Sequence, residues 1–135
     1  IHTREKNQKV LITADTVVCL DAKILGKPEN REHAIEMLHR LSGRKHQVVT
    51  GVCLTTLQEH RSFSAYTDVY FKTLLDQEII CYVDTYKPFD KAGAYGIQEW
   101  IGYIGIERIE GSFYNVMGLP VQQLYEALRR FPKKS

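Results

Sequence analysis

The 135-residue sequence lacks the features that mark membrane proteins and simple metal sites. No apolar run approaches the roughly 20 residues that a membrane-spanning helix needs. The five histidines form no i, i+4 pair and the three cysteines form no C-x-x-C pair, so neither a histidine metal site nor a zinc knuckle is indicated. No charged-then-apolar leader opens the chain. We therefore expect a cytoplasmic protein without a membrane segment.

A strong excess of charge is missing as well. Eighteen Lys and Arg against sixteen Asp and Glu leave a net charge of +2, which is too small to indicate nucleic acid as a partner. The cysteines Cys19, Cys53 and Cys81 each lie among apolar neighbours, so we expect buried, reduced thiols. With 44% hydrophobic residues, the chain has the composition of one globular domain over residues 1–135.

The sequence does contain strand and helix patterns that alternate along the chain. Residues 10–20 form an apolar run that predicts a central strand in a sheet covered on both faces. Residues 30–41 predict a helix, because Asn30 can cap its start and Gly43 can end it. These patterns favour a mixed α/β domain.

The second half of the sequence continues the same mixture. Residues 47–57 and 62–74 predict two long strands joined by a hairpin. Asp76 is expected to cap a short helix, and Pro120 is expected to open a final amphipathic helix. Five of the nine glycines fall within residues 93–111, so we expect tight turns or a close ligand contact there.

Asp15 is the most informative single residue, because it interrupts the apolar run of the first strand. A carboxylate at that position must be paired, bound to a metal or exposed in a cleft, since burying it alone is costly. A strand-end aspartate that accepts hydrogen bonds from backbone amides is an equally good interpretation of the pattern.

Two further segments place a lysine beside small residues. Lys27 lies between Gly26 and Pro28, just before the best helix, which is typical of phosphate sites but lacks the spacing of a P-loop. A solvated turn lysine is the alternative. Residues 90–98 offer Lys91 as a cation and Gln98 as a donor and acceptor for an amide edge such as a pyrimidine ring. An ion pair between neighbouring residues 90 and 91 is the alternative there.

Seven blocks, in order, closely resemble the Maf family of nucleotide pyrophosphatases, also called septum formation inhibitor proteins. The blocks are residues 12–18, 25–28, 41–48, 50–51, 90–98, 109–116 and 118–120. The resemblance runs over nearly the whole chain, from residue 10 to residue 131. It implies an elongated α/β domain with a long mixed sheet, flanking helices and a central cleft, like that of the inosine triphosphate pyrophosphatases.

The resemblance also implies an activity and a set of site residues. It implies hydrolysis of a nucleoside triphosphate, in the branch acting on dTTP and UTP, to the monophosphate and diphosphate with a divalent cation, Mg²⁺ or Mn²⁺. Asp15 matches the catalytic proton acceptor, Lys27 and Lys91 match phosphate-binding lysines, and Thr16 and Gln98 match positions tied to substrate choice. The metal ligands stay unassigned.

The resemblance also bears on oligomeric state, on an alternative function and on the start of the chain. The resemblance is compatible with a homodimer, and a non-catalytic regulator of septum formation that acts through a protein partner is the alternative function. The family opens with a strand ending in Ser-x-Arg-Arg and a helix, which nothing before residue 10 matches. We therefore expect residues 1–135 to form a Maf-like domain without that first strand and helix, with residues 1–8 as a helix tail.

Overall fold

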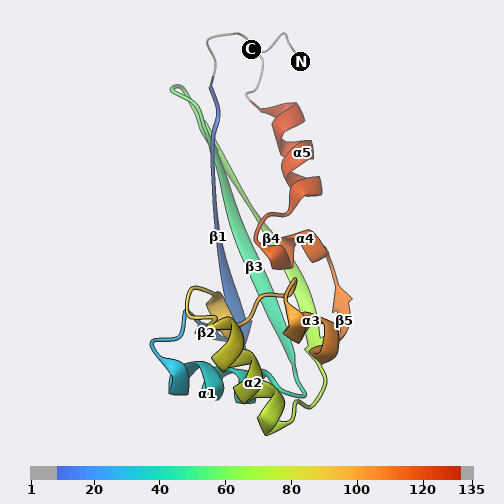
Figure 1. The fold of residues 1–135 in the computed structure, drawn as a ribbon. Coiled ribbons are helices and arrows are strands. Elements are labelled where there is room, and N and C mark those ends of the chain that lie inside the picture. The colour runs from blue at the N-terminus through green and yellow to red at the C-terminus, as the bar shows by residue number, and fades with distance from the viewer. Residues whose placement is uncertain (1–8, 132–135) are drawn as a thin grey trace.

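A computed structural model describes residues 9–131. Five strands form one sheet in the order β2-β1-β3-β4-β5. The strands are β1 (Leu11–Leu20), β2 (Lys23–Leu25), β3 (Lys45–Thr55), β4 (His60–Phe71) and β5 (Ile106–Glu110). The helices are α1 (Arg31–Leu41), α2 (Asp76–Tyr86), α3 (Trp100–Gly105), α4 (Phe113–Met117) and α5 (Val121–Arg130), with a short 3₁₀ turn η1 (Ala92–Ala94). The long strands β1, β3 and β4 give the molecule its elongated shape (Figure 1).

The elongated sheet flanked by helices confirms the expected fold class. Each strand pairing among the described residues is antiparallel, whereas a mixed sheet was expected. The β3–β4 hairpin pairs from Lys45↔Tyr70 to Thr55↔His60, so the predicted hairpin is confirmed with both strands starting two residues earlier than expected. One connection crosses a strand: β3 pairs with β1 and not with β2, so the segment that carries α1 passes from β2 over β1 to β3.

The helices pack on one face of the sheet. Along β3 the side chains of Val48, Thr50, Val52 and Leu54 are all buried, while Gly51 between them is exposed. Since successive residues of a strand point to opposite faces, these four define the face under the helices. The opposite face stays partly exposed among the described residues, so the sheet and its helices form two layers.

This arrangement corrects the prediction for the first strand. In β1 the residues Leu11 to Asp15 are exposed, with Leu11 63% and Ile12 40% accessible. The strand is therefore covered on one face at its second half, and its first half is an exposed edge. The apolar run could not reveal this, because exposure depends on β2, which pairs with β1 only from Val18 onward.

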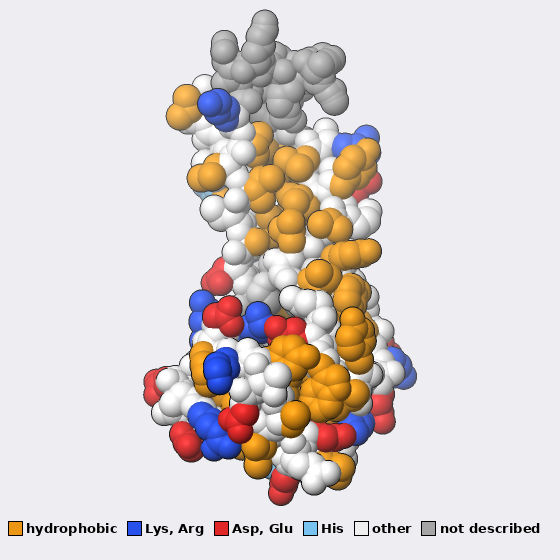
Figure 2. Space-filling view, in the orientation of Figure 1, with side chains coloured by type: hydrophobic (Ala, Val, Ile, Leu, Met, Phe, Trp, Pro, Cys, Tyr) orange, Lys and Arg blue, Asp and Glu red, His pale blue; other side chains and the backbone are white. Residues whose placement is uncertain are grey.

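Two apolar clusters lie between the layers at opposite ends of the sheet. The large core gathers α1, α2, α3 and η1 over the end of the sheet near β2, and includes Leu38, Leu41, Val69, Ile79 and Ile101. The small core lies under α5 and consists of Val52, Leu54, Leu124 and Phe131 with partly buried neighbours. Figure 2 shows charged side chains concentrated over the large-core end and apolar ones along the other end.

Local signals placed most helices correctly. Asn30 caps α1, its Oδ1 accepting a hydrogen bond from the backbone N–H of His33 at 2.9 Å. Gly43 follows with φ +70°, a conformation that favours glycine at a helix end. The cap of α2 is Leu75 rather than Asp76, because the Glu78 carboxylate instead accepts from the Leu75 backbone N–H. Pro120 precedes α5 as its cap residue, directly before the first helical residue.

The cysteine prediction was wrong about burial. All three cysteines are free thiols, but Cys19 and Cys53 are half-buried and Cys81 is exposed. Their apolar neighbours alternate between the two faces, and Cys19 and Cys53 lie on the uncovered face of the sheet. The expected helix tail over residues 1–8 lies outside the described residues. No helix in the described part of the chain is both long and apolar enough to cross a membrane.

Candidate active site

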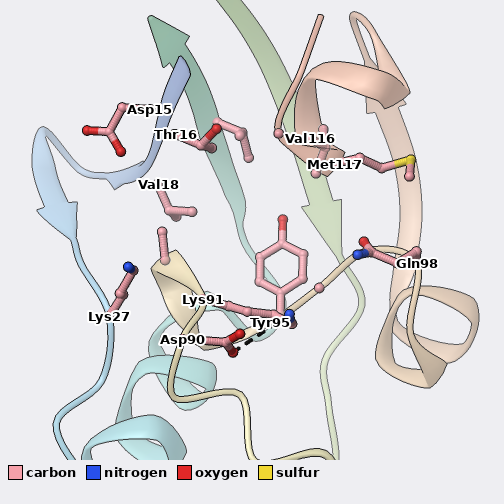
Figure 3. A pocket seen from close by; sticks show the side chains of 14 residues that line it. Asp15, Thr16, Val18, Lys27, Asp90, Lys91, Tyr95, Gln98, Val116 and Met117 are labelled. Carbon is pink, nitrogen blue, oxygen red and sulfur yellow. Dashed lines mark ion pairs between the residues drawn. The ribbon is translucent and has the colours of Figure 1, made fainter. Parts of the chain in front are cut away.

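One pocket brings together all five site residues expected from the sequence. Its cavity measures about 280 Å³ and lies where β1, the turn before α1, η1 and α4 meet. Asp15, Thr16, Lys27, Lys91 and Gln98 line it (Figure 3). Other lining residues are Val18, Val48, Asp90, Ala92, Tyr95, Gly96, Val116, Met117 and Gly118. Residues up to about 100 positions apart along the chain therefore share one cavity.

Asp15 and Thr16 reach this pocket from opposite faces of the same strand. Thr16 pairs with Thr50 on the face under the helices, while Asp15 pairs with Gly51 on the other face. Because β2 pairs with β1 only from Val18 onward, the edge of β1 is open at Asp15. The carboxylate is exposed and lies at that edge, on the same side of the close-up as Lys27 (Figure 3).

The structure bears on the two interpretations of Asp15. Within residues 9–131, its carboxylate accepts no hydrogen bond and forms no ion pair, so it does not act as a strand-end residue that satisfies backbone amides. It instead lines the cavity at the open strand edge. An exposed carboxylate with free lone pairs, in a cavity that lysine side chains also line, is suited to hold a cation or a water molecule.

The turn that carries Lys27 is tied to the loop that carries Lys91. The backbone N–H of Gly93 donates a hydrogen bond to the carbonyl of Gly26 at 3.1 Å. Gly93 has φ +72°, and a Cβ there would lie 2.9 Å from Cγ2 of Val18. Only glycine lets this loop approach β1 so closely, which explains part of the glycine enrichment in the segment.

Lys91 shows both features proposed for it. Its Nζ lies 3.7 Å from Oδ1 of Asp90, so the ion pair between neighbours is present. The aliphatic part of the side chain crosses Gly96, where a Cβ would come within 3.0 Å of Lys91 Cε. Both residues line the pocket, and the Asp90 side chain is 78% exposed. Because a solvated pair of this kind is weak, an anionic ligand can compete for the ammonium group.

A buried tyrosine, which the sequence analysis did not single out, forms hydrogen bonds to the loop that carries Lys91. The Tyr82 hydroxyl of α2 donates to Oε1 of Glu99 at 2.5 Å and accepts from the backbone N–H of Gly96 at 3.1 Å. Burial, followed by the bond to Glu99, raises the pKa of Tyr82, so its hydroxyl keeps its proton. The bond fixes Gly96, and with it the position at which Lys91 crosses the loop.

A second buried pair supports the pocket floor. The hydroxyl of Tyr95 lies 2.7 Å from Nε2 of His46, and the imidazole stacks on Phe71 with ring centroids 5.5 Å apart. Burial lowers the pKa of His46 to about 4, so the ring is neutral at pH 7. The block around His46 belongs to the sequence resemblance, but nothing in its pattern predicts contact with Tyr95, 49 positions away.

The donor set of the pocket fits a cation that is shared with a ligand. Within residues 9–131, no group of three or more His, Cys, Asp and Glu side chains is placed to hold a metal ion. Asp15 and Asp90 are the two carboxylates in the lining, and Asp90 is paired with Lys91. Mg²⁺ is commonly bound by one or two carboxylates together with the phosphates of a substrate and water. The site therefore suits a metal that arrives with a polyphosphate better than one held permanently by the protein.

Comparison with known proteins gives close relatives. A protein from Bacteroides thetaiotaomicron is 63% identical over 122 residues, covering 90% of this chain and 63% of the relative. One from Porphyromonas gingivalis strain W83 is 60% identical over 126 residues, covering 93% and 63%. One from Christiangramia forsetii is 49% identical over 124 residues, covering 92% and 63%. Each is named dTTP/UTP pyrophosphatase.

The comparison shows how much of each relative the chain covers and to which family the chain belongs. The chain spans 63% of the length of each of the three relatives. Its match to the family described as Maf-like protein covers residues 1–131. That match includes each of the sequence blocks from which the resemblance was inferred, and the resemblance is confirmed. The chain belongs to the Maf-like protein family.

Proposed function

We propose that the protein hydrolyses nucleoside triphosphates of the dTTP and UTP class to the monophosphate and diphosphate. The observation that carries this proposal is the single pocket lined by Asp15, Thr16, Lys27, Lys91 and Gln98. The pocket combines a carboxylate, two lysines that can stabilise phosphate charge and two side chains that can bind a base. The names of the three relatives support the same reaction and give no support to the non-catalytic regulator.

The lysines would bind the phosphates. Lys27 lies opposite Gln98 in the close-up of the pocket, and Lys91 lies below Tyr95 (Figure 3). A triphosphate bound by Lys27 and Lys91 places its base on the side of Gln98 and Met117. The two ammonium groups would offset negative charge that accumulates on the phosphates during attack by water.

Asp15 would orient the attacking water and accept its proton. A divalent cation, Mg²⁺ or Mn²⁺, would be held by Asp15 and the phosphate oxygens. When bound, such a cation makes water more acidic and neutralises phosphate charge. Asp15 suits this role because its carboxylate is exposed at the strand edge and has no protein partner within residues 9–131.

The test is phosphate release from a panel of triphosphates, coupled to inorganic pyrophosphatase, with Mg²⁺ or Mn²⁺ present. The protein is expressed from its complete reading frame. We expect UTP and dTTP to be the best substrates. Asp15→Asn should lower turnover by about 100-fold or more, in the range of a lost general base. Asp76→Asn is the matched control, since Asp76 is exposed at the start of α2 and lies away from the pocket. Hydrolysis confined to purine triphosphates would contradict the proposal.

Three related expectations stay predictions: a cytoplasmic location, a homodimer, and a single domain over residues 1–135. Cell fractionation tests the first and light scattering of the purified protein tests the second. Limited proteolysis tests the third, because a single domain resists cleavage between its elements.

A further inference from the structure

Thr50 lies directly beneath the pocket, on the strand next to Thr16. It is fully buried in the middle of β3. Its Oγ1 lies 2.8 Å from Oγ1 of Thr16 and 3.3 Å from the backbone carbonyl oxygen of Asn115 at α4. The Thr50 hydroxyl therefore joins a pocket residue on one side to a buried carbonyl on the other.

The direction of these two hydrogen bonds follows from a count of protons. Each threonine hydroxyl has one proton, and a carbonyl oxygen can only accept. If Thr50 donates to Asn115, Thr16 must donate to Thr50, and both contacts are hydrogen bonds. If Thr50 donates to Thr16 instead, two acceptor oxygens face each other at 3.3 Å in a buried place with no proton between them. Such an arrangement is unfavourable, so the first direction is the one that the geometry supports.

The accepting carbonyl is itself held in place by a buried network. The side-chain Nδ2 of Asn115 donates to the Val48 carbonyl at 3.3 Å and to Thr67 Oγ1 at 2.9 Å. Thr67 in turn donates to the Ser112 carbonyl at 3.1 Å, and Ser112 Oγ accepts from the Asn115 backbone N–H at 3.1 Å. Asn115 and Thr67 are buried, so α4 has little freedom to move its carbonyl away from Thr50.

We propose that Thr50 is a positioning residue that makes the Thr16 hydroxyl a hydrogen-bond acceptor toward the pocket, so that the pocket prefers a base that donates at this point. This inference rests on the proposed function and deepens it. The N3–H of uracil and thymine is a donor, whereas N3 of cytosine is an acceptor. Gln98 cannot make this choice alone, because its amide carries a donor and an acceptor and can rotate.

The position of Thr16 agrees with a contact to the base rather than to the phosphates. In Figure 3 Thr16 lies beside Asp15 and above Val18, while Lys27 and Lys91 lie lower in the view. A Cβ at Gly118 would lie 3.9 Å from Thr16 Oγ1, so the absence of a side chain there keeps the hydroxyl accessible. A phosphate oxygen is an acceptor, and it gains nothing from a hydroxyl whose proton is already given to Thr50.

The experiment compares the binding of UMP and CMP by isothermal titration calorimetry. These ligands share sugar and phosphate, so the ratio of their dissociation constants isolates the base. With the protein expressed from its complete reading frame, we expect UMP to bind about tenfold tighter than CMP, the scale of one hydrogen bond gained against one acceptor left unpaired. Thr50→Val should bring the ratio near one, because the Thr16 proton is then free to turn into the pocket. Thr50→Ser keeps the hydroxyl and should retain the preference.

Each outcome decides the inference. An unchanged ratio in Thr50→Val overturns it, and so does an equal loss in Thr50→Val and Thr50→Ser, which would mean that Thr50 acts through packing alone. If Thr50→Val does not fold, Thr16→Val replaces it, and a retained UMP preference there overturns the inference. Hydrolysis of UTP is measured separately. A protein that does not hydrolyse UTP but shows the Thr50-dependent ratio refutes the proposed function and supports the inference.

Discussion

The two ends of the sheet differ in how much apolar surface they bury. The large core packs parts of four helical elements against β1, β3 and β4, and its members Leu38, Leu41 and Ile79 are fully buried. The small core has α5 as its single helix among the described residues, and Tyr125 of that helix is 62% exposed. At the same end, the first half of β1 is exposed.

The candidate active site lies where these two ends meet. Along β1, the exposed half ends at Asp15 and the half-buried and buried residues begin at Thr16. The Asp15 carboxylate can therefore be open to ligand, while its neighbour Thr16 is held by the packed layer. Rigid support on one side and access on the other are what a site of this kind needs, because positioning requires fixed side chains.

The largest expected effect is on the free energy of unfolding, and it compares the same substitution in the two cores. Leu38 on α1 and Leu54 on β3 are both fully buried, one in each core. We expect Leu38→Ala to lower the free energy of unfolding by about 4 kcal/mol and Leu54→Ala by about 2 kcal/mol, because the thinner layer around Leu54 can collapse into the space. Urea denaturation measures both. Equal losses would mean that the small core is as tightly packed as the large one.

The next effect depends on pH and acts through His46, which packs against Phe71 and Tyr95 of the large core. Its pKa is lowered to about 4 by burial, against an ordinary value near 6.5. Between these values the unfolded chain binds the extra proton, so stability is full above about pH 6.5 and falls as the pH drops toward 4. The loss attributable to this group is on the order of 3 kcal/mol.

The control for this pH effect is His46→Phe, which places another aromatic ring at this position but cannot take a proton. Urea denaturation of both proteins at pH 7 and pH 4 gives the comparison. We expect the native sequence to lose more stability than the variant over this interval. If both lose the same amount, other groups account for the acid sensitivity and His46 is not the responsible residue.

A smaller effect tests the junction between the site and the large core. Gly93→Ala adds a Cβ at φ +72°, 2.9 Å from the Val18 side chain. We expect about 2 kcal/mol of destabilisation, from strain and contact together, and weaker binding of UMP because the loop that carries Lys91 is displaced. Gly26→Ala is the matched control, since a Cβ there meets nothing within 4 Å. Similar binding losses in both variants would argue against the close approach as the cause.

The smallest effect concerns the support beneath that loop. Tyr82→Phe removes the hydroxyl that bonds Glu99 and the Gly96 backbone, and should cost about 1 kcal/mol. Tyr86→Phe is the control, because Tyr86 stacks on Tyr82 from the same helix and is 41% exposed. Thermal unfolding of the two variants checks the difference. An equal or larger loss in Tyr86→Phe, which removes a hydroxyl but keeps the stacked ring, would mean that the bonds of the Tyr82 hydroxyl to Glu99 and Gly96 are not what stabilises the protein.

Local chemistry made much of the fold predictable. Asn30 and Gly43 marked the start and the end of α1 in the sequence, because both act within one turn of the helix. Burial in β4 alternates from residue to residue, as the period-two geometry of a strand requires. The five site residues came from a resemblance of whole sequence blocks, and the structure brings them to one pocket.

The features that the sequence did not predict depend on contacts between segments that are distant along the chain. The Thr50 hydroxyl bonds a carbonyl 65 positions away, and a threonine within a strand pattern carries no sign of that partner. The exposure of Cys81 and of the first half of β1 depends likewise on which elements happen to cover them. The contact between His46 and Tyr95 could not be predicted either, because only the fold brings these two residues together.

The hydrogen bond from Gly93 to Gly26 restricts how the chain can change in length near the site. An inserted residue in the turn before Lys27 would shift the Gly26 carbonyl, and the loop bonded to it would follow or lose its partner. A deletion in either segment would act in the same way. The two lysine-bearing segments therefore form one unit whose lengths are coupled. We expect inserted residues to be tolerated better in a distant turn, such as residues 56–59 between β3 and β4.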